Sequence, residues 1–559
     1  MVRNSMLSIC KRFGHFTKLD PRSCVKLCLV LLAIVWVDWS IATSTGSTAA
    51  ACTGFSDNDG TAAPADSNLP NVIVFLVDDM GLMDTSVPML TDDNGAPVMH
   101  PLNKWYQTPN MEKLAATGIR FSIFYAQSVC SPTRVSILTG QNAARHRTTN
   151  WIRPSENNRG KFGPPEWNWA GLDSESITLP RLLQQKGYRT IHVGKAHLGP
   201  NDHDGCDPLK LGFEVNVGGH SAGHPASYYG KDNYGNDEAK EKPGVHAVPH
   251  LEKYHGTETY LTEALTIEAN RCMQESVADG KPFFLHMAHY AVHSPFHSDP
   301  RFAKKYSKAE GRSKQQKAFA TMIEGIDKSL GDIVGKVNEL GVADNTLLIF
   351  LGDNGSDARI GKPKQHGSSA PLRGMKATEF EGGMRVPFIA SWLQADQKNE
   401  WQQALPIAAG EIQQQLGTVN DLMPTILSLV GQEVPEGYAV DGTNLATQLN
   451  GKRNVQRSET FLMHYPHQHR GSYFTTYRDG DWKLIYYYQP KKDGKSKNLL
   501  YNLKEDPYEN SDLASKQPEQ LHRMINKMKR QLEAENAIFP VDSEGNELRP
   551  ETKLVGAEQ

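Results

Sequence analysis

Two short apolar runs, each ending in paired polar residues, constrain most strongly how this chain can fold. Asn71–Val77 (NVIVFLV) is followed directly by Asp78-Asp79, and Thr346–Leu351 (TLLIFL) is followed by Gly352 and then by Asp353-Asn354. Short runs rich in β-branched and aromatic residues are typical of strands that are buried on both faces of a parallel sheet. We therefore expect two buried strands with polar side chains at their carboxyl ends.

Helical patterns alternate with strand-like runs along the chain. Two further strands are expected at Tyr188–Val193 and Phe283–Met287. Helices are expected at Asn110–Thr117, Thr133–Leu138, Leu179–Lys186, Thr257–Ser276 and Lys314–Leu340. This alternation predicts an α/β fold in which helices cover both faces of one sheet. Residues 200–256 lack such a pattern, and we expect them to form a long surface excursion near the cleft.

Polar residues at three expected strand ends should meet at one edge of the sheet, where α/β proteins bind ligands. They are Asp78 and Asp79, Lys195 and His197, and Asp353 and Asn354. Taken alone, Asp78-Asp79 is a helix cap beside a solvated acid. With Asp353 and Asn354 it offers three carboxylates and an amide oxygen, which suit a hard cation such as Ca²⁺ or Mg²⁺.

The segment Cys130–Arg134 (CSPTR) is the most informative one in the sequence. Pro132 suits the first turn of a helix, so Cys130 should lie at a helix N-terminus, where an anion is favoured. Arg134 lies one turn further on and can return to the same face. On these residues alone, Cys130 is an inert buried thiol, half of a disulfide, or a thiolate nucleophile.

The N-terminal residues resemble a segment for export. Six basic side chains precede the apolar run Leu27–Val37, and Ser40-Ile41-Ala42 offers a cleavage site. The run is too short to span a membrane, and a buried helix is the alternative. We expect a signal peptide over residues 1–42, a flexible linker over 43–69, and a protein exported to the periplasm or the extracellular space. Without residues 1–42 the formal charge of −3 becomes about −7, which gives no reason to expect a nucleic-acid partner.

The pattern changes after about residue 440. Four short strand-like runs are separated by turn residues such as Arg478-Asp479-Gly480, and a basic helix follows. The runs are Phe461–His464, Ser472–Tyr477, Trp482–Tyr488 and Asn498–Leu503, and the helix is Pro518–Ala537. We expect residues 441–559 to form a C-terminal subdomain with a small antiparallel sheet and one helix.

The Cys130 segment, followed by Ser136–Gly140 (SILTG), resembles the Cys-x-Pro-Ser/Thr-Arg motif of the formylglycine-dependent sulfatases. Other segments resemble motifs of this family in the same order along most of the mature chain. They are Asn71–Asp79, Thr108–Leu114, Gly194–Gly199, Ala291–Pro295, Leu351–Gly355, Arg373–Lys376, Glu381–Pro387, Gly480–Ile485 and Leu500–Leu503. Ala196 departs from the pattern, because the family usually has Trp there. The joint occurrence of these motifs in order is specific to the family.

The resemblance implies an alkaline-phosphatase-like catalytic domain over residues 70–440, with a large mixed, mostly parallel sheet sandwiched by helices. In the family a formylglycine-generating enzyme oxidises the cysteine, so Cys130 would supply a formylglycine whose hydrate is the nucleophile. The metal ligands would be Asp78, Asp79, Asp353, Asn354 and residue 130. The cation would be Ca²⁺, with Mg²⁺ as the alternative.

The resemblance also assigns roles to five basic residues. Arg134 and the metal would favour ionisation of one hydroxyl of the hydrate, and Lys195 and Lys376 would bind the sulfate. His293 would protonate the leaving alcohol. His197 would take a proton from the second hydroxyl, so that sulfate is expelled and the aldehyde restored.

The predicted function is therefore that of a sulfatase acting on sulfated carbohydrates, with aryl sulfates as model substrates. A phosphodiesterase or phosphonate monoester hydrolase of the same superfamily is the alternative enzyme, and a non-catalytic sulfated-glycan-binding protein is a third hypothesis. Trp151, Trp167 and Trp169 either stack on sugar rings or anchor their Gly/Pro-rich loop in the core. We expect His192 to be a core histidine, and the spacing of the neighbouring histidines matches no established zinc site.

Overall fold

The computed structural model describes residues 69–237, 244–358, 369–470, 473–489 and 498–551. The expected signal peptide and all but the last residue of the expected linker lie outside these ranges. Residues from Ala62 onward form one compact unit, which holds every element named below. No helix among the described residues is both long enough and apolar enough to cross a membrane.

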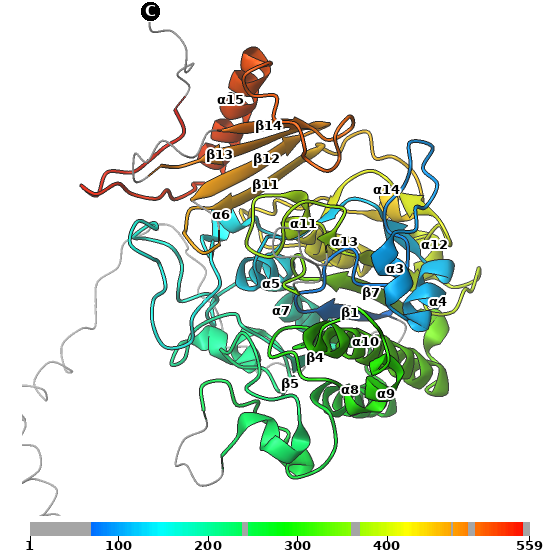
Figure 1. The fold of residues 1–559 in the computed structure, drawn as a ribbon. Helices are drawn as coiled ribbons and strands as arrows, with labels where there is room; N and C mark the ends of the chain where they lie inside the picture. Colours follow the sequence, from blue (N-terminus) through cyan, green and yellow to red (C-terminus); the bar gives the residue numbers. More distant parts are fainter. Residues whose placement is uncertain (1–68, 238–243, 359–368, 471–472, 490–497, 552–559) are drawn as a thin grey trace, which may run out of the picture. The chain divides into compact units, whose positions relative to one another are not determined.

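An eight-stranded sheet lies at the centre of the fold (Figure 1). Its strands, in spatial order, are β5 (Val215–Val217), β4 (Arg189–Gly194), β6 (Phe283–His289), β1 (Asn71–Val77), β7 (Thr346–Gly352), β8 (Phe388–Trp392), β2 (Ile119–Phe121) and β9 (Ile412–Gln413). Strands β5 to β7 pair in parallel, whereas β8 is antiparallel to both of its neighbours. The expected mixed, mostly parallel sheet is thus confirmed.

Strand β1 is buried on both faces, as its apolar run predicted. Val72, Val74 and Leu76 join one hydrophobic core, whereas Ile73, Phe75 and Val77 join the other. Because side chains alternate along a strand, a run this apolar can satisfy two cores at once. The strand therefore holds its carboxyl end rigidly between the two helical layers.

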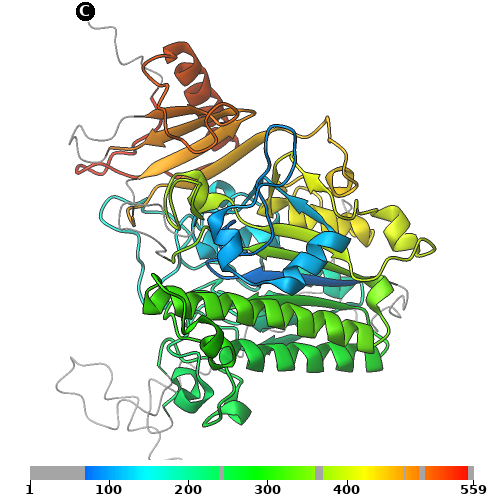
Figure 2. The ribbon, with the colours of Figure 1, turned by 45° about the vertical axis from the view of Figure 1, so that its right-hand side comes forward.

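Helices cover both faces of the sheet, and Figure 2 shows the long helices α8 and α10 side by side. The helices are α3 (Pro101–Trp105), α4 (Pro109–Thr117), α5 (Cys130–Thr139), α6 (Ala143–His146), α7 (Leu179–Gln185), α8 (Leu261–Ala278), α9 (Pro300–Tyr306), α10 (Lys314–Glu339), α11 (Glu381–Met384), α12 (Glu400–Ala404), α13 (Leu422–Leu429), α14 (Ala446–Leu449) and α15 (Pro518–Ala534). One core contains residues of α4, α8 and α10, and the other contains residues of α5, α7 and α13.

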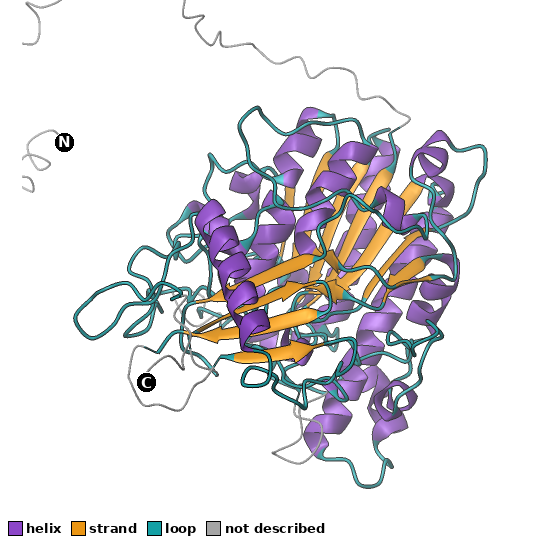
Figure 3. Cartoon of the chain, turned by 90° about the horizontal axis from the view of Figure 1, so that it is seen from above, coloured by secondary structure: helices purple, strands orange, loops and turns teal. Residues whose placement is uncertain are grey.

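A four-stranded antiparallel sheet and helix α15 follow the central sheet along the chain (Figure 3). Its strands are β11 (Thr460–Tyr465), β12 (Phe474–Asp479), β13 (Trp482–Tyr487) and β14 (Leu499–Asn502), and each pairs with the next. Met524, Met528 and Leu532 of α15 share a core with Tyr477 and Leu484 of this sheet. This is the small sheet with one helix that the sequence predicted. Two short strands, β3 (Phe124–Tyr125) and β10 (Gly417–Thr418), pair in parallel elsewhere.

Candidate active site

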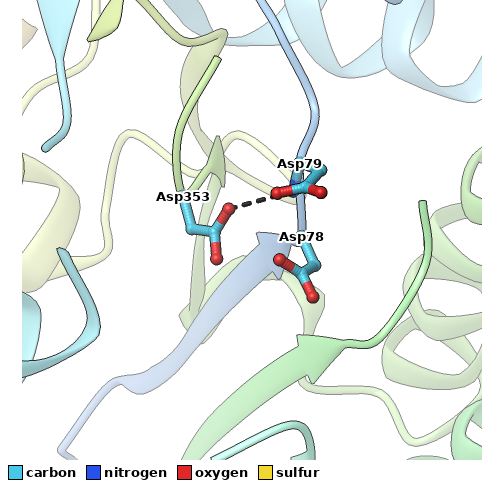
Figure 4. A group of neighbouring side chains, drawn as sticks. All are labelled: Asp78, Asp79 and Asp353. Atoms are coloured by element: carbon cyan, nitrogen blue, oxygen red, sulfur yellow. Dashed lines mark hydrogen bonds between the residues drawn. The ribbon is translucent and has the colours of Figure 1, made fainter. Parts of the chain in front are cut away.

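Three carboxylates meet at the carboxyl ends of β1 and β7 (Figure 4). Asp78 and Asp79 follow β1, Asp353 follows β7, and each offers an oxygen that lies within 4.8 Å of those of the others. The Asp79 backbone N–H donates to Asp353 Oδ1 over 3.0 Å, which ties the two strand ends together. Asp79 has a φ of 58°, a left-handed conformation that costs free energy and is typical of functional turns.

The oxygen atoms of this group fit a cation. Among the described residues, the buried atoms without a hydrogen-bond partner include Asp78 Oδ1, Asp79 Oδ2 and Asn354 Oδ1. Asn354 donates from Nδ2 to Asp79 Oδ1 over 2.8 Å, which fixes its amide beside the carboxylates. Buried oxygens are normally hydrogen-bonded, so three unsatisfied ones in one place match the ligand set of a hard divalent ion. Among the described residues, no other group of three or more His, Cys, Asp or Glu side chains is placed to share a metal ion.

Three buried cations face the carboxylates. Lys195 Nζ lies 2.6 Å from Asp78 Oδ2, and Lys376 Nζ lies 2.6 Å from Asp79 Oδ1. Arg134 donates from Nε and Nη2 to Asp353 Oδ2 over 3.0 and 2.9 Å. The structure thus brings together six charged residues and the amide of Asn354, all of which sequence analysis named as candidate site residues.

The cations and burial shift the pKa values of the carboxylates in opposite directions. Burial raises the pKa of Asp78 well above its usual value, and the ammonium of Lys195 opposes this shift. Burial would also raise the pKa of Asp79, but Lys376 and His293 outweigh it and hold that pKa below its usual value. Burial would lower the pKa of Lys376, but the carboxylate of Asp79 outweighs it and raises that pKa.

Cys130 begins helix α5, as the position of Pro132 predicted. Its side chain is buried, and Sγ lies 3.3 Å from His197 Nδ1. Burial raises the pKa of the Cys130 thiol, with Lys195 and Lys376 opposing the shift. The thiol therefore experiences the charges of both lysines and of the carboxylate group.

His197 is held from two sides. Its Nε2 lies 2.6 Å from the carbonyl oxygen of Ile152, which leaves Nδ1 directed at the Cys130 sulfur. Burial lowers the pKa of His197 well below its usual value, and Lys195 adds to this. A Cβ on Gly223 would lie 2.6 Å from His197 Cε1, so the absence of a side chain there makes room for the ring.

His293 also lies beside the carboxylates. Its Nε2 is 3.6 Å from Asp79 Oδ2, and Nδ1 is 2.8 Å from the Ser294 carbonyl oxygen. Burial and the charge of Lys376 lower the pKa of His293 well below its usual value. The ring stacks at 5.5 Å on His224, which itself stacks at 3.9 Å on His246. His224 and His246 come from the excursion over residues 200–256, and their role was not predicted.

A pocket of about 660 Å³ opens beside these residues. Its lining includes Cys130, His197, His293 and Lys376, together with loop residues from several segments that are distant in sequence. His469 and Arg470 belong to the segment after β11, and sequence analysis missed them as pocket residues. A histidine-rich loop after a short strand (HYPHQHR) was the only available signal.

The three loop tryptophans have different environments. Trp151 lines the pocket, whereas Trp167 is 4% exposed and packs with Ile152 and Ile538. Trp169 is partly buried against the same cluster and donates its indole N–H to the Arg153 carbonyl oxygen over 3.1 Å. Stacking on a sugar therefore remains an option for Trp151, and the loop-anchoring interpretation holds for Trp167.

Several other histidines and cysteines lie outside the pocket lining. His192 is buried, with Nδ1 3.2 Å from His286 Nδ1, which confirms the expected core histidine. His289 accepts or donates a hydrogen bond with Ser329 over 2.9 Å. Among the described residues, Cys206 and Cys272 are free thiols, and Cys52 lies outside them.

Comparison with known proteins identifies the family. The sulfatase family model matches residues 70–432, and a model described as the C-terminal part of N-sulphoglucosamine sulphohydrolase matches residues 376–537. N-acetylgalactosamine-6-sulfatase of Mus musculus is 33% identical over 400 residues, which cover 68% of this chain and 67% of that protein. Arylsulfatase A of Homo sapiens is 28% identical, covering 84% of this chain and 90% of that protein.

Solved structures show the same fold. The crystal structure of Ps i-CgsB superposes with a TM-score of 0.66 and 24% identity, covering 85% of this chain and 96% of that one. The match of the family model over more than half of the chain, together with the identity to curated sulfatases, settles the classification. The chain belongs to the sulfatase family and is a sulfuric ester hydrolase.

Proposed function

We propose that this sulfatase removes sulfate from carbohydrates, with a nucleophile made from Cys130. One observation carries the proposal: Cys130 lines a pocket together with His197 and with Lys376, whose ammonium pairs with Asp79 of the carboxylate group that has unsatisfied oxygens. A protein that only binds sulfated glycans would need the cations of this site but not the cysteine. The cysteine at the start of α5, next to a candidate base at 3.3 Å, is explained by catalysis.

Two groups that complete such a site fit the residues present. A divalent ion, Ca²⁺ with Mg²⁺ as the alternative, would be held by Asp78, Asp79, Asp353 and Asn354 together with residue 130. It would neutralise the carboxylates and stabilise negative charge on the reacting oxygens. Formylglycine at position 130 would supply a hydrated aldehyde, which offers both a hydroxyl nucleophile and a second hydroxyl for releasing sulfate.

The side chains of the chain divide the remaining work. Arg134 is fixed by Asp353 and by the Lys195 carbonyl oxygen, to which Nη1 donates over 2.7 Å. It places a permanent positive charge beside residue 130. Lys195 and Lys376 offer ammonium groups to the sulfate oxygens, whose spread negative charge grows during transfer.

The two histidines act on protons. His293 lies on the pocket wall and would protonate the leaving sugar oxygen. His197 Nδ1 faces residue 130 and would take the proton that must leave before sulfate is expelled. The lowered pKa of His197 keeps its imidazole neutral near neutral pH, and the neutral ring has the free lone pair that a base needs. His293 would need to be protonated when substrate binds, and the carboxylate of Asp79 favours that form.

A carbohydrate substrate is supported by the relatives and by the pocket. The relative from Mus musculus is named for a sulfated N-acetylhexosamine. A pocket of about 660 Å³ also has room for a sugar ring as well as a sulfate. We further propose that residues 1–42 direct export to the periplasm or extracellular space, and that a formylglycine-generating enzyme acts during maturation.

Aldehyde-reactive labelling tests this proposal. Protein produced together with a formylglycine-generating enzyme should carry the label on the peptide that contains residue 130. Cys130→Ala should remove the label and the hydrolysis of 4-nitrophenyl sulfate while the fold is preserved, and Cys206→Ala serves as the matched control. Full activity without label at position 130 would refute the formylglycine assignment.

Parallel assays separate the alternative enzyme. The same preparation is given a sulfate monoester and bis(4-nitrophenyl) phosphate. We expect kcat/KM to be higher for the sulfate ester, because a sulfate monoester presents three unsubstituted oxygens to the cations of the site, whereas a phosphate diester presents two. A higher kcat/KM for the phosphate diester would instead support the phosphodiesterase reading.

A further inference from the structure

The pocket extends well beyond the residues assigned to the sulfate. Its further lining includes Trp151, Arg153, His224, Asp357, His469 and Arg470. These residues come from four segments that are distant in sequence, and the family motifs named above include none of them. Together these six residues form a wall of the pocket that the leaving group of the ester would contact.

Trp151 offers a fixed aromatic surface. Its backbone N–H donates to Asn150 Oδ1 over 2.9 Å, and its carbonyl oxygen accepts from Asn158 Nδ2 over 2.8 Å. The indole meets the edge of His469 at 6.0 Å, and the guanidinium of Arg153 lies 5.4 Å from its centroid. A ring held in this way can cover the C–H face of a sugar without losing much conformational freedom.

Asp357 and Arg470 offer paired polar groups in the same wall. Arg470 donates from Nη2 to Asp357 Oδ2 over 2.8 Å, and Nη1 pairs with the other carboxylate oxygen. The side chain of Arg470 is 28% exposed, and that of Asp357 is 16% exposed. A guanidinium beside a carboxylate presents donors and an acceptor together, which suits neighbouring hydroxyl groups.

The charges of this wall cancel. Arg153 pairs with Glu156, and Arg470 pairs with Asp357. Burial lowers the pKa of His224, and it lowers that of His469 to about 4, so both rings are neutral at pH 7. We call Lys195 and Lys376, which would bind the sulfate, the sulfate cradle. Among the described residues that line the pocket, Lys376 is therefore the one cation whose ion-pair partner, Asp79, is a candidate metal ligand. A second anionic group on the substrate would meet Asp357 without an unpaired cation beside it.

We infer that this wall is a leaving-group subsite for a hexose ring whose one charged group is the sulfate to be removed. Trp151 stacks on the ring, and the Asp357–Arg470 pair binds its hydroxyls. The inference rests on the proposed function and adds the class of sugar: monosulfated rather than densely anionic. Trp151, Asp357 and Arg470 are the residues that determine this specificity.

Substitution of Trp151 tests the stacking. With the monosulfated hexose disaccharide that the wild type cleaves best, Trp151→Leu should raise KM about tenfold, the size of one lost aromatic contact. Trp151→Phe should restore most of the loss. The inhibition constant of inorganic sulfate measures how tightly Lys195 and Lys376 bind sulfate, and it should change less than twofold. Trp482→Leu, a half-buried tryptophan outside the pocket, is the control.

Substitution of Asp357 tests the charge balance. The wild type should have a higher kcat/KM for the monosulfated disaccharide than for its disulfated counterpart. Asp357→Asn removes the carboxylate and leaves Arg470 unpaired, so the disulfated-to-monosulfated ratio should rise about tenfold. Asp332→Asn, an exposed aspartate on α10, should leave that ratio unchanged.

The outcomes separate this inference from the proposed function. A wild type that cleaves no sulfate ester, 4-nitrophenyl sulfate included, defeats the proposed function. An active wild type that prefers the disulfated sugar overturns the inference alone. So does a Trp151→Leu variant whose disaccharide KM and sulfate inhibition constant rise equally, or an Asp357→Asn variant with an unchanged ratio.

Discussion

At the scale of single residues, the site depends on buried side chains of opposite charge that lie in close contact. Lys376 lies 2.6 Å from Asp79, and Lys195 lies 2.6 Å from Asp78, and all four residues are buried. Charges buried this deeply must be paired, because desolvation of an isolated one costs several kcal/mol. Changing one member therefore alters the behaviour of its neighbours, which can be measured.

Asp79→Asn should weaken cation binding. The substitution removes one negative charge and one of the oxygens that has no hydrogen-bond partner. Because affinity for Ca²⁺ follows the number of charged ligands, the dissociation constant should rise about 100-fold or more. Calorimetric titration with Ca²⁺ of protein treated with a chelator measures this. Asp332→Asn is the matched control, and an unchanged affinity for Asp79→Asn would remove that residue from the ligand set.

His293→Gln should affect poor leaving groups most. A sugar alkoxide must be protonated as it leaves, whereas 4-nitrophenolate is stable without a proton. We expect kcat to fall roughly 10²- to 10⁴-fold for a sulfated sugar, the usual range for a general acid, and much less for 4-nitrophenyl sulfate. His522→Gln on α15 is the control. Equal losses on both substrates would show that His293 does not act as the acid.

The residue scale is also where sequence-based prediction succeeded and failed for clear reasons. Asp78 and Asp353 could be predicted to meet, because both end buried strands and parallel strands share a carboxyl edge. Arg470 could not, because its place in the pocket depends on how the segment after β11 packs against the loop around Trp151. No periodicity or spacing encodes such a contact.

At the scale of elements, strongly patterned segments were predicted well. Strand β1 spans Asn71–Val77 and helix α10 spans Lys314–Glu339, close to the bounds expected from apolar runs and helical periodicity. Short elements such as β9 and α11 were not predicted. They have two and four residues, and pairing or packing with distant segments rather than local pattern forms them.

Helix α15 contains a feature that should set a pH dependence of stability. Glu535 lies at its C-terminal cap, is 3% exposed, and burial raises its pKa to about 8. The unfolded chain loses this proton near its usual pKa, whereas the folded chain keeps it until about pH 8. Folding stability should therefore fall as the pH rises from about 4.5 to 8.

Glu535→Gln should remove this pH dependence. At pH 8 we expect the variant to be more stable than the wild type by about 2–4 kcal/mol, with little difference at pH 4.5. Urea unfolding at several pH values measures the two curves. Glu533→Gln, an exposed neighbour on the same helix, should follow the wild type. Parallel curves for Glu535→Gln and the wild type would contradict the assignment.

At the scale of the whole molecule, a buried ionic group joins the C-terminal sheet to the loop that carries Lys376. Lys483 of β13 lies 3.0 Å from Glu381 and 2.6 Å from Glu509, and all three are buried. Glu381 begins α11 and also accepts from the Tyr125 hydroxyl over 2.8 Å. We propose that the predicted boundary at residue 440 separates two sheets that share this group and are not independent in stability.

Lys483→Met should destabilise the whole protein. It removes the ammonium that lies between two buried carboxyl groups and leaves Glu381 with the guanidinium of Arg385, 3.6 Å away, which costs about 3–5 kcal/mol. Adding Glu509→Gln should recover part of the loss, because fewer charges then remain unpaired. Chemical unfolding of the single and double variants measures the coupling. Lys527→Met, which breaks an exposed pair with Asp479, should cost less than about 1 kcal/mol.

The burial of Cys130 bears on the order of events when the protein is made. The side chain is 2% exposed and lies at the start of a helix in which every residue is buried. If Cys130 is converted to formylglycine as proposed, a modifying enzyme that binds the CSPTR segment as an extended chain would have to act before helix α5 packs into the fold. Conversion of the thiol would then compete in time with folding, and a chain that folded first would keep an inactive thiol.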